Sequence, residues 1–267
     1  LRHVLREQVP PARRVQLHLR LGTALERRHA GRLAGIAAEL GLHAEQGLLP
    51  GRAATFLSMA AAQAMRRLAP RHALALAERG LARLAAAGPG ADSAEELGFT
   101  LHAQRLLALV ATNGYASPPT LAAAREAEAA IDAAPALPPA LPLWYGCAWI
   151  EIYTGHAGRA LGLAQALHAR ADATAPALGH ALALTLQGIV AYHGNRYAEA
   201  RMQLEQALRL LEGVPAGFEA TYVPQSPLLE ALAHLGLVQE LLGDESAAAA
   251  SRARLSRSEE RRVGKEC

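Results

Sequence analysis

One stretch decides the fold: residues 182–211, LALTLQGIVAYHGNRYAEARMQLEQALRLL, which contain two apolar helical patterns separated by a turn signal. The turn is predicted at Gly194-Asn195, because both residue types tolerate a positive φ. The apolar residues of the second half recur at offsets of 0, 4, 7, 8 and 11, which places them on one stripe of an α-helix; they are Ala200, Leu204, Ala207, Leu208 and Leu211. Off this stripe, Glu205 and Arg209 are predicted to form an i, i+4 ion pair.

The same stretch resembles a tetratricopeptide repeat, in which small residues let paired helices approach and larger ones fill the gap between them. The positions that carry the resemblance are Gly188, Tyr197, Ala200, Leu204, Ala207 and Leu208. Weaker copies occur before and after it, with Ala73, Ala77, Gly80 and Leu81 in one and Ala160, Ala164 and Leu167 in another. The resemblance implies a tetratricopeptide-like, right-handed helical solenoid of about six degenerate helix-pair repeats.

Composition agrees with an all-α class. Hydrophobic residues make up 51% of the 267 residues and are mostly Ala and Leu, whereas aromatic residues make up only 4%. Ala and Leu have the highest helix propensities, and the residue types that favour strands are scarce.

Five segments are expected along the chain. Residues 1–10 are the end of a linker, residues 11–133 and 143–256 are two blocks of repeats, and the proline-rich residues 134–142 connect the blocks. Residues 213–227 form a second long connection. The last segment, residues 257–267 (RSEERRVGKEC), resembles a translated sequencing adapter and holds the only lysine, Lys265, so a non-native tail is predicted there.

Charge is distributed unevenly. Residues 1–90 contain 14 arginines against 5 acidic residues, and residues 91–256 contain 9 arginines against 16 acidic residues. The basic part permits a nucleic-acid-binding array as an alternative function. The other interpretation is a solvated helix face, or an interface to a neighbouring domain.

No motif for chemistry is present, so no catalytic, cofactor-binding or metal-ligating residue is assigned and the chain is not predicted to be an enzyme. The sequence lacks a Walker lysine, HExxH and GxSxG, and no two histidines are spaced i, i+4. Outside the tail Cys147 is the only cysteine, which leaves no intramolecular disulfide and favours a cytoplasmic location. The uncharged residues 173–195 are interpreted as a buried helix and not as a membrane span, because polar residues and a proline interrupt them.

A few side chains are candidates for binding. His18 and His43 occur on the first two expected helices, where nearby arginines permit an anion site and helix packing is the alternative; these arginines are Arg13, Arg14 and Arg20. An aromatic cluster follows the proline-rich connection and could either stack on a ligand or pack in the core; it comprises Trp144, Tyr145, Trp149 and Tyr153.

Two further features are interpreted as structural. Glu126 and Glu128 are two residues apart on a helix, so their side chains are expected to diverge and not to form a carboxylate dyad. Cys147 is expected to be a small buried hydrophobe.

The beginning of the chain, LRHVLREQVPPARRVQLHLRLGTALE, resembles a segment of large bacterial signalling ATPases that leads from a winged-helix segment into a tetratricopeptide array. The matching positions include His3, Arg13-Arg14, Leu17-His18, Gly22, Ala24-Leu25, Leu40, His43, Gly47 and Ala53. The resemblance implies the protein-interaction and signal-sensing arm of a multidomain, ATP-dependent regulator of transcription, of the LuxR or OmpR-like type, or of a cyclase-linked ATPase. Its implied partners are a protein or small inducer on the concave face and the upstream ATPase and winged-helix domain. A free-standing tetratricopeptide adaptor is the remaining alternative.

Overall fold

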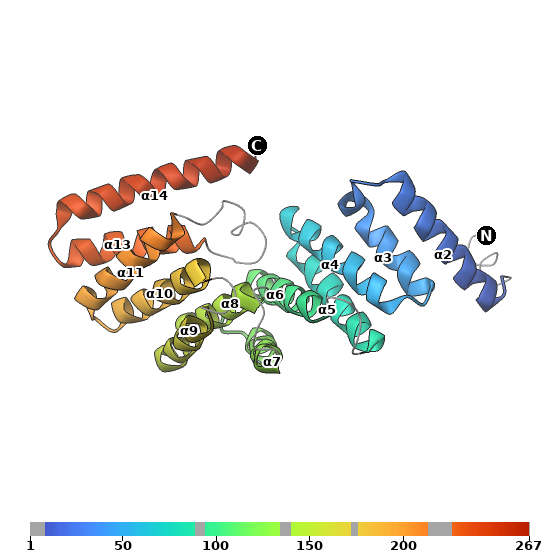
Figure 1. Cartoon of the computed structure of the whole chain (residues 1–267), viewed down its shortest axis with the longest axis horizontal. Helices are drawn as coiled ribbons and strands as arrows, with labels where there is room; N and C mark the ends of the chain where they lie inside the picture. Colours follow the sequence, from blue (N-terminus) through green and yellow to red (C-terminus); the bar gives the residue numbers. More distant parts are fainter. Residues whose placement is uncertain (1–8, 89–93, 134–139, 172–175, 213–225, 267) are drawn as a thin grey trace. The chain divides into compact units, whose positions relative to one another are not determined.

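The computed structural model describes residues 9–88, 94–133, 140–171, 176–212 and 226–266 (Figure 1). This described part contains twelve α-helices, one short 3-10 helix and no strand, which confirms the all-α prediction. None of the described helices is long and apolar enough to cross a lipid bilayer. The chain divides into two compact units, residues 1–114 and 115–267.

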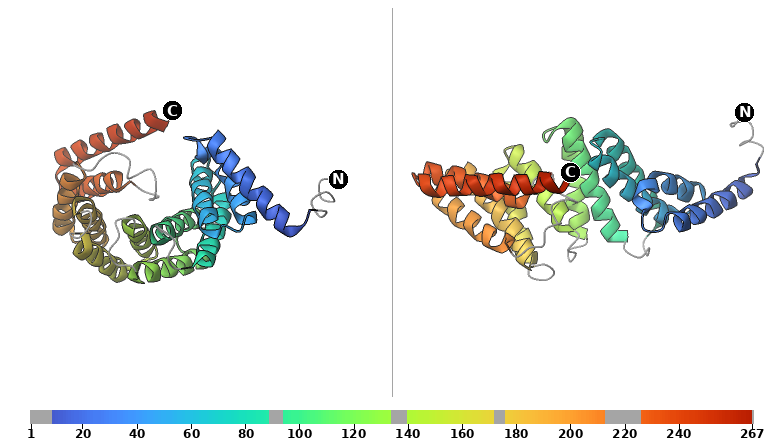
Figure 2. Two further views of the ribbon diagram at one scale, coloured as in Figure 1. Left: turned by 45° about the vertical axis from the view of Figure 1, so that its right-hand side comes forward. Right: turned by 90° about the horizontal axis from the view of Figure 1, so that it is seen from above.

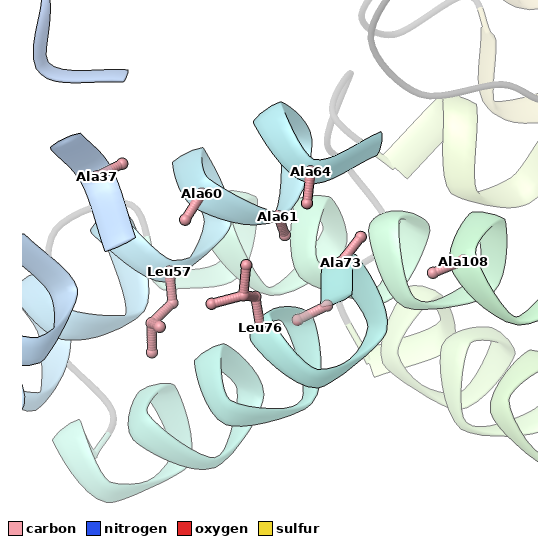
Figure 3. Packing of buried hydrophobic residues seen from close by; sticks show 9 residues of the cluster. Ala37, Leu57, Ala60, Ala61, Ala64, Ala73, Leu76 and Ala108 are labelled. Carbon is pink, nitrogen blue, oxygen red and sulfur yellow. The ribbon is translucent and has the colours of Figure 1, made fainter. Parts of the chain in front are cut away.

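The first unit is a series of helices in which each packs on the next. Its elements are α2 (Pro11–Arg28), η1 (Leu33–Ile36), α3 (Ala37–Gln46), α4 (Pro50–Arg66), α5 (Pro70–Ala87) and α6 (Ala94–Asn113). Figure 3 shows why alanine dominates its core, since short side chains from α4 and α5 meet there with little space between the helices. The labelled core residues are Ala37, Leu57, Ala60, Ala61, Ala64, Ala73, Leu76 and Ala108.

The second unit continues the same pattern. Its elements are α7 (Pro118–Ala133), α8 (Ala140–Tyr153), α9 (Ala157–Ala171), α10 (Pro176–His193), α11 (Tyr197–Leu211), α13 (Pro227–Leu241) and α14 (Glu245–Glu266). Helix α10 packs on α9 and α11, as Figure 2 shows, and it also contacts α8 and α13. This central position explains why α10 is apolar on nearly all sides.

Proline and positive-φ residues mark many of the helix ends. Proline is accommodated in the first turn of α2, α4, α5 and α13, where no intrahelical donor is required. The predicted turn between α10 and α11 is confirmed: Asn195 adopts a φ of +59°, and the amide of Arg196 donates to the carbonyl of Ala191.

Small residues allow close helix contact at the positions that the repeat pattern indicates. A Cβ on Gly188 of α10 would lie 2.7 Å from Cγ of Leu204 on α11, and a Cβ on Gly80 of α5 would lie 2.5 Å from Cδ2 of Leu101 on α6. The corresponding stripe residues of α5 and α11 are fully buried, as predicted; they are Ala73, Ala77, Ala200, Leu204 and Ala207.

Several local expectations differ from the structure. Residues 140–142 belong to α8 and not to the proline-rich connection, because a helix tolerates Pro142 in its first turn. Glu205 forms an ion pair with Arg201 at 2.9 Å instead of with Arg209. Arg201 also reaches Asp244 at 3.3 Å, and this second ion pair holds its guanidinium between the two carboxylates. The two compact units meet at residue 114, and α7 packs on α8 within the second unit.

The expected tail, residues 257–267, is helical as far as Glu266, where it continues α14. Residues 1–8, most of the connection 213–227 and residues 134–139 lie outside the described residues.

Candidate functional site

The aromatic side chains of α8 form a stripe that runs from the core to the surface of the second unit. Tyr145, Trp149 and Tyr153 follow one another at intervals of four residues, so they share one face of the helix. The Trp149 ring stacks on Tyr153 with a centroid distance of 5.3 Å and meets Tyr145 edge-on at 6.1 Å. Tyr145 and Trp149 are buried, whereas half of Tyr153 is exposed. Tyr153 also contacts the ring of Tyr115 at 4.2 Å.

Helices α10 and α13 add rings to this stripe. His234 of α13 lies with its ring centroid 6.4 Å from Trp149 and 5.6 Å from Tyr192 of α10. His193, which is exposed, lies 6.2 Å from His234. We call Trp149, Tyr153, Tyr192, His193 and His234 the aromatic–histidine cluster. Its five rings come from three helices.

The protonation state of His234 follows from its surroundings. Its Nδ1 lies 2.9 Å from the carbonyl oxygen of Glu230. Because a carbonyl can only accept, Nδ1 is the protonated nitrogen and Nε2 of the neutral ring is an acceptor. Burial lowers the pKa of His234, and the nearby His193 lowers it further, although the bond to the Glu230 carbonyl acts in the opposite direction.

Glu230 supplies the acidic group of this region. Its carboxylate lies 3.5 Å from His234 Nδ1, and its side chain is only 19% exposed. Burial raises the pKa of Glu230. Since the lowered pKa of His234 keeps that ring neutral near pH 7, it does not balance the charge of the carboxylate.

Most members of the predicted aromatic cluster belong to the core. Core packing is confirmed for Trp144, Tyr145 and Trp149, which are at most 4% exposed, whereas Tyr153 is half exposed. The guanidinium of Arg170 lies 4.7 Å from the Trp144 ring. Within the described part of the chain, the indole nitrogens of Trp144 and Trp149 have no hydrogen-bond partner.

His18 and His43 meet between α2 and α3, with their Nδ1 atoms 3.0 Å apart. They line a small hollow of about 10 Å³ together with Glu26, Arg52 and other residues of α2, α3 and α4. Glu26 pairs with Arg52, so a carboxylate borders the hollow, which disfavours an anion there. Arg13, Arg14 and Arg20 are exposed and do not line it. The pair therefore fits the packing interpretation.

Glu126 and Glu128 do not form a carboxylate pair. Glu126 is exposed, while Glu128 accepts a 2.9 Å hydrogen bond from Arg159, so the two glutamates diverge as predicted. Arg159 also pairs with Glu151 at 3.0 Å. Burial raises the pKa of Glu128, with Arg159 opposing this effect.

Cys147 is fully buried, as predicted, and its Sγ lies 3.8 Å from the Ala124 carbonyl oxygen. Burial raises the pKa of its thiol far above the usual range, with the negative charges of Glu128 and Glu151 adding to the effect. Such a thiol is a poor nucleophile at neutral pH.

Sequence inspection missed the groups that tertiary packing brings together. His234, Tyr192 and Trp149 are far apart in the sequence, as are Glu128 and Arg159. His168 and His180 approach across α9 and α10, with 3.3 Å between their Nδ1 atoms. In the described ranges no three histidine, cysteine or acidic side chains gather closely enough to hold a metal ion.

Comparison with known proteins identifies a similar fold. No family model matches the chain, and no curated protein matches it. The chain is similar to the crystal structure of BtubC (BKLC) from P. vanneervenii, with a TM-score of 0.61 and 17% sequence identity, over 96% of this chain and 94% of that one. At this identity the likeness is one of fold alone.

Proposed function

We propose that the chain is a tetratricopeptide-like, right-handed helical solenoid that serves as the partner-binding and signal-sensing arm of a larger ATP-dependent regulator of transcription. The observation that carries this proposal is the aromatic–histidine cluster. Tyr153 is half exposed although its ring stacks on the buried Trp149, so a rigid aromatic surface is presented to solvent. Rigid aromatic groups with one polar end are frequent anchors in protein interfaces.

The repeat architecture is supported by two kinds of contact. Glycine at positions 80 and 188 lets the next helix approach closely, and the equivalent stripe residues of α5 and α11 are fully buried. A series of similar helix pairs in which each packs on its neighbours is the arrangement of a solenoid. The likeness in fold to BtubC extends over nearly the whole chain.

Helix α2 gives the proposed arm a way to contact the rest of the regulator. Leu17 and Leu21 of this helix are 42% and 50% exposed. On this proposal they pack against the upstream winged-helix and ATPase domain. Partner binding alters that packing. It can do so only if the partner binds with unequal affinity to the two states of the regulator, the one in which α2 packs in this way and the one in which it does not.

The experiment has a genetic and a functional part. Sequencing the source DNA beyond both ends of this reading frame is expected to reveal an upstream ATPase with a Walker motif and further helical repeats downstream. In the full-length regulator, Tyr153→Ala and Leu21→Glu are then expected to change the dependence of output on signal. Met202→Ala is the matched control, because Met202 is 59% exposed on α11 and lies outside the cluster. Unchanged regulation in both variants would reject the proposal.

The alternatives make different predictions. A free-standing adaptor requires a start codon just before Leu1 and a stop codon soon after Ser256. A nucleic-acid-binding array requires affinity that falls steeply with salt. Against the latter, three arginines of the basic part are already engaged in ion pairs: Glu26 pairs with Arg52, and Glu45 pairs with both Arg79 and Arg83.

A further inference from the structure

Helix α2 has two faces of different character. On the inner face, Nδ1 of His18 lies 3.0 Å from Nδ1 of His43 on α3. Gly22 is buried, and Leu25 packs against apolar residues of α3 and α4. These positions of α2 are three or four residues apart, so they define the side on which the helix joins the rest of the first unit (Figure 1).

The outer face of α2 carries an exposed apolar ridge. Leu17, Leu21 and Ala24 follow one another at intervals of four and three residues, and all three are exposed. Arginines extend the same stripe at both ends, since Arg14 precedes Leu17 by three residues and Arg28 follows Ala24 by four. An apolar centre with a polar rim is the arrangement that protein interfaces share.

The charge around this ridge is positive. Glu26 is the only acidic residue among the five arginines of α2, and it is paired with Arg52. Arg13 and Arg14 lie near the beginning of the helix, where the helix dipole disfavours a cation and the first turn contains no acidic residue. Within the described ranges, no ion pair is formed by the exposed arginines around the ridge, which are Arg13, Arg14, Arg20 and Arg28. Such a surface attracts an acidic partner.

We propose that the outer face of α2 binds an acidic amphipathic helix of a partner domain. The partner helix packs apolar side chains against Leu17 and Leu21 and places carboxylates beside the arginines. A helix suits the ridge because side chains four residues apart form a row that fits between the side-chain rows of a second helix. A nucleic acid offers charge to the arginines but no apolar surface to the leucines. The inference rests on the proposed docking of α2 and specifies the chemistry of the surface that α2 meets.

The test measures binding of the full chain to three fluorescent helical peptides of about 15 residues at low salt. The first peptide has a leucine stripe bordered by glutamates. The second replaces each leucine by alanine, which preserves helix propensity, and the third replaces each glutamate by lysine. The first peptide is expected to bind at least about tenfold more tightly than either of the others, because it alone offers both apolar surface and opposite charge.

Leucine variants test the apolar ridge. The double substitution Leu17→Ala with Leu21→Ala is expected to weaken the first peptide by about tenfold. Leu68→Ala is the matched control, because Leu68 is 90% exposed and follows α4, away from the ridge. It is expected to leave the affinity unchanged.

Arginine variants test the charged rim. The double substitution Arg14→Gln with Arg28→Gln is expected to weaken the first peptide by about tenfold and to reduce the dependence of its affinity on salt. Arg71→Gln is the matched control, since Arg71 is an exposed arginine of α5. Circular dichroism and melting curves show whether each variant is folded, and all the exchanged side chains are exposed.

Several outcomes would overturn the inference. They are equal binding of the alanine or the lysine peptide, binding that both double variants of α2 leave unchanged, and absence of peptide binding. Tighter binding of a DNA duplex or an anionic lipid vesicle, lost in Arg14→Gln with Arg28→Gln, would assign the arginines to that ligand instead. The proposed function is decided separately, by the signal dependence of Leu21→Glu in the full-length regulator, so the two failures are distinguishable.

Discussion

Gly188 of α10 lies so close to Leu204 of α11 that a Cβ at residue 188 would be 2.7 Å from Leu204 Cγ and 2.9 Å from its Cδ2. Leu204 is fully buried and has little freedom to move aside. The contact fixes how closely α10 and α11 can approach each other.

Gly188→Ala is therefore expected to destabilise the chain although alanine favours helix. Overpacking costs about 1–3 kcal/mol, which exceeds the propensity gain of about 1 kcal/mol. Gly162→Ala in α9 is the matched control: no atom lies within 4 Å of its added Cβ, so the free energy of unfolding should rise by about 0.5–1 kcal/mol. Chemical denaturation followed by circular dichroism measures both. Equal stabilisation by the two substitutions would show that the close contact imposes no restraint.

Leu68 follows the end of α4 with a φ of +55°, and its side chain is 90% exposed. The amide of Ala69 donates to the Ala64 carbonyl, which is the hydrogen bond of a helix end that normally carries glycine. Leu68→Gly should stabilise the chain by about 0.5–1 kcal/mol, because the Cβ is unfavourable in this conformation. Leu68→Ala, which keeps the Cβ, should change the denaturation midpoint little. A midpoint shift of similar size in both variants would exclude backbone strain as the cause.

His234 is predicted to make stability depend on pH. Its pKa is lowered below the ordinary value of 6.5 by burial, so the unfolded chain binds the proton more readily than the folded chain. Stability contributed by the neutral ring is complete above pH 6.5 and is lost as pH falls toward the lowered pKa. His234→Phe keeps an aromatic ring but removes the titrating group. Its denaturation midpoint should therefore fall less than that of the wild type between about pH 7.5 and about pH 5.

The raised pKa of Glu230 acts in the opposite direction on acidification, but it is present in both proteins, so comparison with the wild type isolates the histidine. His72→Phe in the first unit, where the histidine is exposed, is the control. Parallel pH profiles for wild type and His234→Phe would contradict the prediction.

Cys147 is predicted to be unreactive in the folded chain, because it is buried and its pKa is raised far above the usual range. Iodoacetamide should modify it only when the second unit unfolds, which peptide-resolved mass spectrometry over a urea series measures. Cys147→Ser should destabilise by about 1–3 kcal/mol, more than Cys147→Ala, since it introduces a buried hydroxyl. Rapid labelling without denaturant would disprove the burial of this thiol.

The sequence by itself determined the helices, because their signals are local. The stripe from Ala200 to Leu208 follows from the period of 3.6 residues, and the turn at Asn195 follows from the tolerance of asparagine for positive φ. Burial of Cys147 and the divergence of Glu126 and Glu128 were predictable for the same reason, since each depends on position within one helix.

Only the tertiary structure decided which side chains of different helices meet. Trp149, Tyr192 and His234 form one cluster because α8 and α13 both pack on α10, and no spacing within the sequence encodes that packing. In the same way Arg201 and Arg209 both lie four residues from Glu205 on α11, yet Glu205 pairs with Arg201, which also reaches Asp244 ahead of α14. Helical periodicity fixes the face on which a residue lies, whereas its partners depend on how successive helices stack, and that is set by side-chain packing over the whole unit.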